Sequence, residues 1–214
     1  WAGVALPPLD LDAQLTGDGA LQALLLTSAE RKLAIRIEPQ QGGRAALEMT
    51  AQSLALPLGG SGFALPEFQA RGQLGAGELL LNTFDARLWD GQIQGNARLR
   101  WGNGWVLEGE ISARQLDGTK LAEGLLSAGR IEGKGNYAMR AASADKLFAA
   151  PRLEVGFSVQ KGALAQVDLT KALQGASAIG GTTPFSEMTG SLGADPARLQ
   201  VRQLRIVAGL LNAT

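Results

Sequence analysis

Apolar and polar residues alternate with a period of two along much of this chain. The clearest case is the segment 93–101, where Ile93, Leu99 and Trp101 share one side and glutamine, asparagine and arginine residues share the other. Strict alternation of this kind predicts a β-strand with one apolar face and one wet face. Comparable alternation recurs over residues 9–15, 33–38, 47–52, 68–74, 78–88, 105–114, 131–141 and 153–159.

Glycine separates and interrupts these predicted strands. Asn103-Gly104 lies between two tryptophans and is a typical hairpin signal. Glycine inside a strand marks a bulge, a bend or a close backbone approach, and glycines fall inside the strand patterns at 95, 109, 133, 135 and 156. The sequence therefore predicts an all-β fold, with a curved antiparallel meander sheet folded over an apolar interior.

Two short segments depart from the strand pattern and are expected to be helical. Residues 119–127 place leucines at helical spacing, and residues 169–174 follow Asp168, a residue type that favours helix N-caps. Residues 115–120 resemble residues 166–171, and residues 91–96 resemble residues 129–134. The two similarities are consistent with a strand–strand–helix unit used twice, or with chance likeness between short segments.

The composition removes most catalytic chemistry. The 214 residues include no histidine and no cysteine, so a Ser-His-Asp triad, a Cys-His pair and the usual zinc ligand sets are excluded. Ser61 lies in a glycine-rich turn that lacks the pattern of a nucleophile elbow. Twenty basic and twenty acidic residues cancel, which argues against a nucleic-acid partner. We expect a non-enzymatic protein with no cofactor and no metal site.

Specific motifs in the C-terminal part carry a family resemblance. Residues 84–91 (FDARLWDG), then Gly95, Trp101 and Trp105, and then the Leu116-Asp117 turn resemble the AsmA family of bacterial envelope proteins. Residues 159–169 (VQKGALAQVDL) and 183–191 (TPFSEMTGS) are similar to the C-terminal region of that family. The match covers residues 84–214, and residues 1–83 are compatible with it but carry no specific motif.

The resemblance implies a periplasmic protein that is tethered to the inner membrane by a segment outside this chain. Members of the family are thought to form long, folded-over sheets whose apolar trough carries phospholipid toward the outer membrane. We therefore expect residues 1–83 to form the β-rich N-terminal part of one sheet and residues 84–214 to form the AsmA-like region. The expected partners are phospholipid acyl chains and the remaining segments of the full-length protein.

The apolar positions of the strands give candidates for the lipid groove. Either a groove or a closed core fits these positions, because alternation fixes sidedness but not what covers each side. The alternative function is a scaffold or adaptor that binds a protein partner during outer-membrane protein assembly. The groove candidates are Leu88, Ile93, Leu99, Trp101, Trp105, Leu107, Ile111, Tyr137, Met139, Leu153, Val155 and Phe157.

Overall fold

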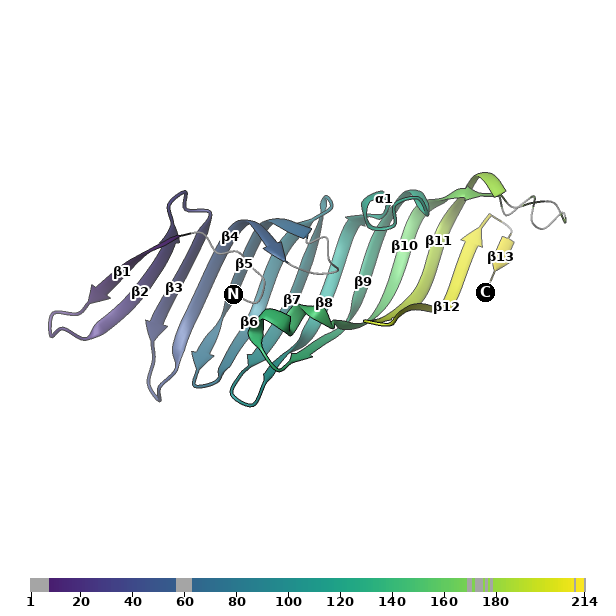
Figure 1. The fold of residues 1–214 in the computed structure, drawn as a ribbon. Helices are drawn as coiled ribbons and strands as arrows, with labels where there is room; N and C mark the ends of the chain where they lie inside the picture. Colours follow the sequence, from purple (N-terminus) through teal and green to yellow (C-terminus); the bar gives the residue numbers. More distant parts are fainter. Residues whose placement is uncertain are drawn as a thin grey trace. The chain divides into compact units, whose positions relative to one another are not determined.

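The fold is an antiparallel meander, in which strands follow one another through the sheet in chain order (Figure 1). A computed structural model describes residues 8–56, 63–168, 171, 175, 177, 179–209 and 211–213. Within these residues the order runs from β1 to β13 without a crossover, and the sheet is not closed. The predicted fold class, an all-β curved meander with short helices, is confirmed.

The strands are short at the start of the chain and lengthen toward its C-terminal half. Their bounds are β1 Leu9–Leu15, β2 Leu21–Ser28, β3 Leu33–Pro39, β4 Ala45–Leu56, β5 Phe63–Gly75, β6 Glu78–Leu88, β7 Gly91–Arg100, β8 Trp105–Asp117, β9 Leu126–Ala141, β10 Arg152–Val167, β11 Ile179–Asp195, β12 Arg198–Ala208 and β13 Leu211–Ala213. The described helical segments with full bounds are α1 (Gly118–Leu121) and the 3-10 helix η1 (Ala144–Ala149).

The chain forms two compact units. Unit 1 comprises Trp1–Leu88, Ile93–Ile111 and Asn136–Arg152, and unit 2 comprises Trp89–Gln92, Ser112–Gly135 and Leu153–Thr214. The expected N-terminal part, residues 1–83, lies within unit 1. Strands β7, β8, β9 and β10 each contribute residues to both units, so the units are not consecutive in sequence.

Tight turns and bulges set the register of the sheet. Trp89 and Asp90 both have positive φ, as the two central residues of a type I′ turn require, and they join β6 to β7. Between β5 and β6 the register shifts after Arg71, which leaves Asn82 unpaired as a bulge. A bulge reverses the alternation of faces for the residues beyond it. Leu81 therefore lies on the same face as Phe84, although the two residues are three positions apart in the chain.

Unit 2 contains the segments that resemble each other in sequence. Gln115 and Gln166 both adopt the left-handed conformation, with φ of 56° and 58°. Two residues later, the Asp117 and Asp168 carboxylates each accept a backbone N–H, from Thr119 at 2.9 Å and from Lys171 at 3.0 Å. The two copies therefore share a left-handed bulge followed by a capping aspartate.

The helices differ from the sequence-based expectation. The predicted helix at 119–127 is wrong in extent, because α1 ends at Leu121 and Gly124 then adopts a φ of +79°. Leu126 is buried in β9, whereas Leu125 is 68% exposed, so the leucines do not form one helical face. The expected helix at 169–174 lies outside the described residues except for Lys171, and the glycine-rich turn at 59–62 also lies outside them. The sequence analysis did not identify η1.

Candidate functional site

The most extensive chemical feature of unit 1 is a continuous apolar sheet face. Directly paired residues of an antiparallel sheet lie on the same face, and the pairs Leu11–Leu26, Leu26–Ile35 and Ile35–Met49 carry one apolar row across four strands. We call the whole set the apolar face. It consists of Leu9, Leu11, Ala13, Leu24, Leu26, Leu33, Ile35, Ile37, Ala45, Leu47, Met49, Ala51, Phe68, Ala70, Leu74, Leu79, Leu81, Phe84 and Ala86.

The opposite face of the same strands is polar and charged. Arg71 pairs with Glu48 at 3.2 Å, and Arg87 pairs with Glu67 at 3.4 Å, both between neighbouring strands. These side chains are exposed, so each pair contributes little to stability. They make this face of the sheet hydrophilic, so the sheet is strongly amphipathic.

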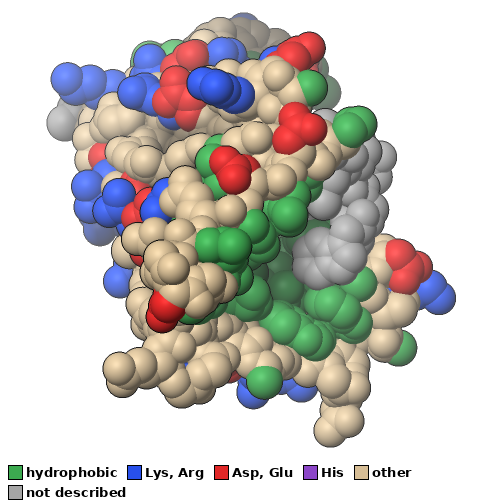
Figure 2. Space-filling model, turned by 90° about the vertical axis from the view of Figure 1, so that its left-hand side faces the viewer, with side chains coloured by type: hydrophobic (Ala, Val, Ile, Leu, Met, Phe, Trp, Pro, Cys, Tyr) green, Lys and Arg blue, Asp and Glu red, His purple; other side chains and the backbone are tan. Residues whose placement is uncertain are grey.

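Much of the apolar face is accessible. Leu11 is 63% exposed, and Leu26, Ile35 and Met49 are half-buried. Other members of the face are buried, namely Leu33, Leu47, Ala51, Ala70 and Ala86. Among the elements that lie wholly in unit 1, strands β1–β5 make their extensive contacts only with their neighbours in the sheet. Seen from the β1 side, hydrophobic side chains gather in a hollow and charged side chains lie around it (Figure 2).

One part of unit 1 has a cover. Leu147 of η1 is 1% exposed and forms a buried cluster with Leu99 and Met139. We call these three residues, together with the partly buried residues that pack against them, the η1 cluster. Its partly buried members are Leu79, Trp101, Trp105, Leu107, Tyr137 and Phe148. Trp101 and Trp105 stack with ring centroids 5.9 Å apart, so the two tryptophans that flank the predicted hairpin belong to a packed core.

Aromatic rings lie over glycines at two neighbouring positions of unit 1. A Cβ added to Gly95 would overlap the carbonyl oxygen of Glu110 and lie 2.7 Å from Phe84 Cζ. A Cβ added to Gly109 would lie 2.7 Å from the Tyr137 hydroxyl. Only glycine fits beneath these rings, and such ring-over-glycine pairs are a known device for pinning curved sheets.

Tyr137 is the most perturbed titratable residue among those described. Its hydroxyl donates a hydrogen bond to the Asn96 carbonyl oxygen at 2.9 Å. Burial raises the pKa of Tyr137 to about 12, because ionisation would place a phenolate against apolar neighbours. The group is therefore neutral at physiological pH and serves to position the ring.

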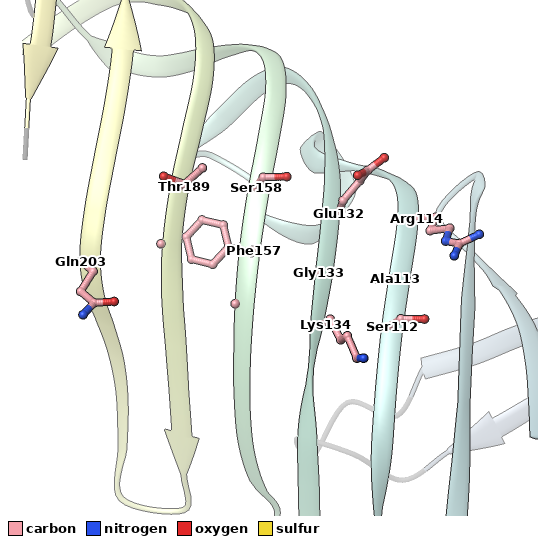
Figure 3. A pocket seen from close by; sticks show the side chains of 12 residues that line it. Ser112, Ala113, Arg114, Glu132, Gly133, Lys134, Phe157, Ser158, Thr189 and Gln203 are labelled. Carbon is pink, nitrogen blue, oxygen red and sulfur yellow. The ribbon is translucent and has the colours of Figure 1, made fainter. Parts of the chain in front are cut away.

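Unit 2 repeats the amphipathic pattern on a smaller scale. Val155 pairs with Leu192, which pairs with Val201, and Leu199 and Val201 are exposed. The Phe157 ring lies over Gly190, where an added Cβ would be 2.9 Å from Cζ. An open depression of about 600 Å³ surrounds this ring (Figure 3).

The charges around this depression are mixed. Arg114 and Lys134 supply positive charge and Glu132 supplies negative charge, alongside Ser112 and Ser158. Glu132 also accepts a hydrogen bond from Gln115 at 3.0 Å. The depression therefore has no clear preference for an anion or a cation.

The structure divides the groove candidates named from the sequence. One group lies in the η1 cluster and the rest lie elsewhere in the two units. Leu99, Trp101, Trp105, Leu107, Tyr137 and Met139 belong to the cluster; Leu88 and Ile93 are buried and Ile111 half-buried in unit 1; Leu153, Val155 and Phe157 are half-buried in unit 2.

The sequence analysis missed the most accessible part of the site. Strands β1–β5 carry the exposed apolar face, yet no residue before Leu88 was named as a groove candidate. The signal was present, because Leu33, Ile35 and Ile37 alternate as regularly as the residues of β7. Only the register shows that these rows continue one another across the sheet.

Reactive groups do not gather at this face. The described residues contain no cluster of three or more carboxylates suited to a metal ion, and no buried side-chain nitrogen or oxygen without a hydrogen-bond partner. Hydrogen bonds from Thr119 lower the pKa of the half-buried Asp117 carboxyl, which keeps this cap of α1 ionised. No described helix is long and apolar enough to span a bilayer.

Comparisons of the chain with protein-family models, with curated proteins and with solved structures found no match.

Proposed function

We propose that this chain is a non-enzymatic, lipid-binding segment of a periplasmic protein anchored in the inner membrane, and that it holds phospholipid acyl chains on their way to the outer membrane. The observation that carries the proposal is the accessible apolar face of unit 1, with large half-buried aliphatic side chains in register across β1–β6. Contiguous exposed apolar surface of this kind marks an interaction site. The resemblance of residues 84–214 to the AsmA family supports the same function.

The dimensions of the face suit an acyl chain. One leaflet of a bilayer is about 15 Å thick in its hydrocarbon part, half of a core of about 30 Å. Neighbouring strands lie about 4.8 Å apart, so such a chain would span about three strand spacings. The rows from Leu11 through Leu26 and Ile35 to Met49 provide three spacings of uninterrupted apolar contact.

The expected binding is weak enough for exchange. Each buried CH₂ contributes about 0.8 kcal/mol, so half-burying a palmitoyl chain gives roughly 6 kcal/mol before ordering costs. Association and ordering costs reduce this value further. A face that passes lipid along needs this balance, because tight binding would hold the lipid in place.

The sheet offers a matched pair of substitutions that tests the proposal. Leu26 lies on the apolar face between Leu11 and Ile35, whereas its neighbour Leu25 lies on the wet face between Asp12 and Arg36. Both leucines are half-buried in β2. Leu26→Asp and Leu25→Asp therefore introduce the same charge at adjacent positions on opposite faces.

We expect wild type and Leu25→Asp to bind a spin-labelled palmitic acid equally. Leu26→Asp should weaken binding roughly 100-fold, since a carboxylate against hydrocarbon costs about 2.5–3.5 kcal/mol. Titration of the spectral signal of the label, with circular dichroism to verify the fold, measures this difference. Equal weakening by both substitutions, or no binding by a folded wild type, would contradict the proposal.

A scaffold that binds a protein partner is the second candidate. It is favoured by the position of β1 at the end of the sheet order, where β1 has, among the described residues, a sheet neighbour on one side only. Such an edge can accept a strand from another chain through backbone hydrogen bonds. Under this alternative a strand-forming peptide would protect the backbone amides of β1 from hydrogen exchange, and fatty acid would have no effect on the apolar face.

A further inference from the structure

The 3-10 helix η1 is placed where the apolar face meets the η1 cluster. Its Leu147 clusters with Leu99 of β7 and Met139 of β9, and Leu79 of β6 packs against the same cluster, at one set of strand ends. Figure 1 shows this short helix in front of the lower ends of these strands. Leu147 fills the centre of the contact and Phe148 packs beside it.

Leu147 and Phe148 attach η1 to the sheet. The hydrogen bond from the Lys146 backbone N–H to the Ser143 carbonyl is long, at 3.3 Å. Ser143 makes no side-chain cap to the helix, and Asp145 and Lys146 are exposed. A six-residue helix without a side-chain cap, which attaches to the sheet through two adjacent apolar side chains, has the features of a segment that opens locally.

Leu79 links this cover to the accessible surface. It pairs with Leu74 on the apolar face and also packs against the η1 cluster. The apolar face therefore runs without a polar break to the point that Leu147 occupies. The side chains beneath η1, including the Trp101–Trp105 stack, have the same apolar chemistry as the open part of the face.

We propose that η1 is a displaceable strap, whose Leu147 and Phe148 occupy the place that a lipid acyl chain takes when it advances along the apolar face. This inference rests on the lipid-binding function proposed above. Leu147 and an acyl chain compete for the same contacts with Leu99 and Met139, so both cannot occupy them together. The strap covers the cluster in the empty state and yields its place in the loaded state.

The absence of cysteine from the chain gives a direct test of strap opening. In the 214-residue chain, Leu147→Cys places a single thiol in the buried contact, and Leu125→Cys places one at an exposed position of unit 2. The rate of reaction with a maleimide is measured for each variant, alone and with vesicles of palmitoyl-oleoyl phosphatidylcholine. Circular dichroism and the binding of spin-labelled palmitic acid are recorded on the same samples.

We expect the thiol of Leu147→Cys to react at least about tenfold faster with lipid than without it, and that of Leu125→Cys to react at one rate throughout. A second variant, Leu147→Ala, should bind spin-labelled palmitic acid about tenfold more tightly than wild type, because the competing side chain is shortened. Lipid binding by wild type together with unchanged labelling of Leu147→Cys would overturn the strap and leave the proposed function intact. If no variant binds lipid, the proposed function fails and the strap fails with it.

Discussion

Burial of Tyr137 should make this protein less stable at alkaline pH. Its pKa is raised to about 12 in the folded chain, against 10.0 for an ordinary tyrosine, because its ring is buried. The folded state therefore holds the phenolic proton more tightly than the unfolded state. The resulting stability is fully present below pH 10 and is lost as the pH rises from 10 through about 12.

The size of this effect follows from the shift. Each pKa unit corresponds to 1.36 kcal/mol, so a shift of about two units contributes roughly 2.7 kcal/mol, all of it lost above pH 12. Tyr137→Phe cannot ionise and should lack this loss. At neutral pH the same variant should be less stable by about 1 kcal/mol, since the hydrogen bond to the Asn96 carbonyl disappears.

Tyr137 is the single tyrosine of the chain, so phenolate absorbance reports this residue alone. Titration of the folded protein should give a midpoint near 12, and titration in denaturant a midpoint near 10. Urea unfolding of wild type and of Tyr137→Phe is measured between pH 10 and pH 12. The difference in stability between the two proteins then contains no contribution from lysine and arginine, which both proteins share. A midpoint near 10 in the folded protein would refute the burial of the ring beside Gly109.

Two further substitutions test the packing. Gly95→Ala places a methyl group against Glu110 and Phe84, whereas a Cβ at Gly193, in β11, meets no atom within 4 Å. Urea unfolding should therefore show Gly95→Ala less stable by about 1–3 kcal/mol and Gly193→Ala unchanged or slightly more stable; equal effects would contradict the tight approach at Gly95. Lys120→Met breaks the exposed ion pair with Asp90, at 2.7 Å, and should leave the midpoint of thermal unfolding nearly unchanged, because solvent screens the pair; a large drop in the midpoint would contradict this.

The sequence was sufficient to locate the strands but not to predict the register in which they pair. Alternation located β3, β7 and β8, and the Asn103-Gly104 signal marked the connection between the last two. These are local patterns, and each follows from the period of a strand. The bulge at Asn82 has no comparable signature in the sequence. One inserted residue turns every residue after it to the opposite face, and the local alternation does not show where the insertion falls.

The strap was invisible in the sequence for a related reason. Leu147 and Phe148 are an isolated apolar pair among alanine and charged residues, which is too short for helical periodicity to appear. Their burial comes from tertiary contacts with Leu99, which is distant in the chain, and with Met139 of the preceding strand. The open part of the apolar face was missed because register, and not alternation alone, joins the rows of β1–β5 into one surface.

The most direct test of the central claim is to map where an acyl chain touches the protein. The 214-residue chain is irradiated with a photoreactive palmitic acid analogue, and the labelled residues are identified by peptide mass spectrometry. The account predicts labels on the apolar face, at positions such as Leu26, Ile35 and Met49, and no labels at Leu25 or Thr50 on the wet face. Labels spread over both faces, or confined to the wet face, would contradict the claim that this sheet face binds lipid.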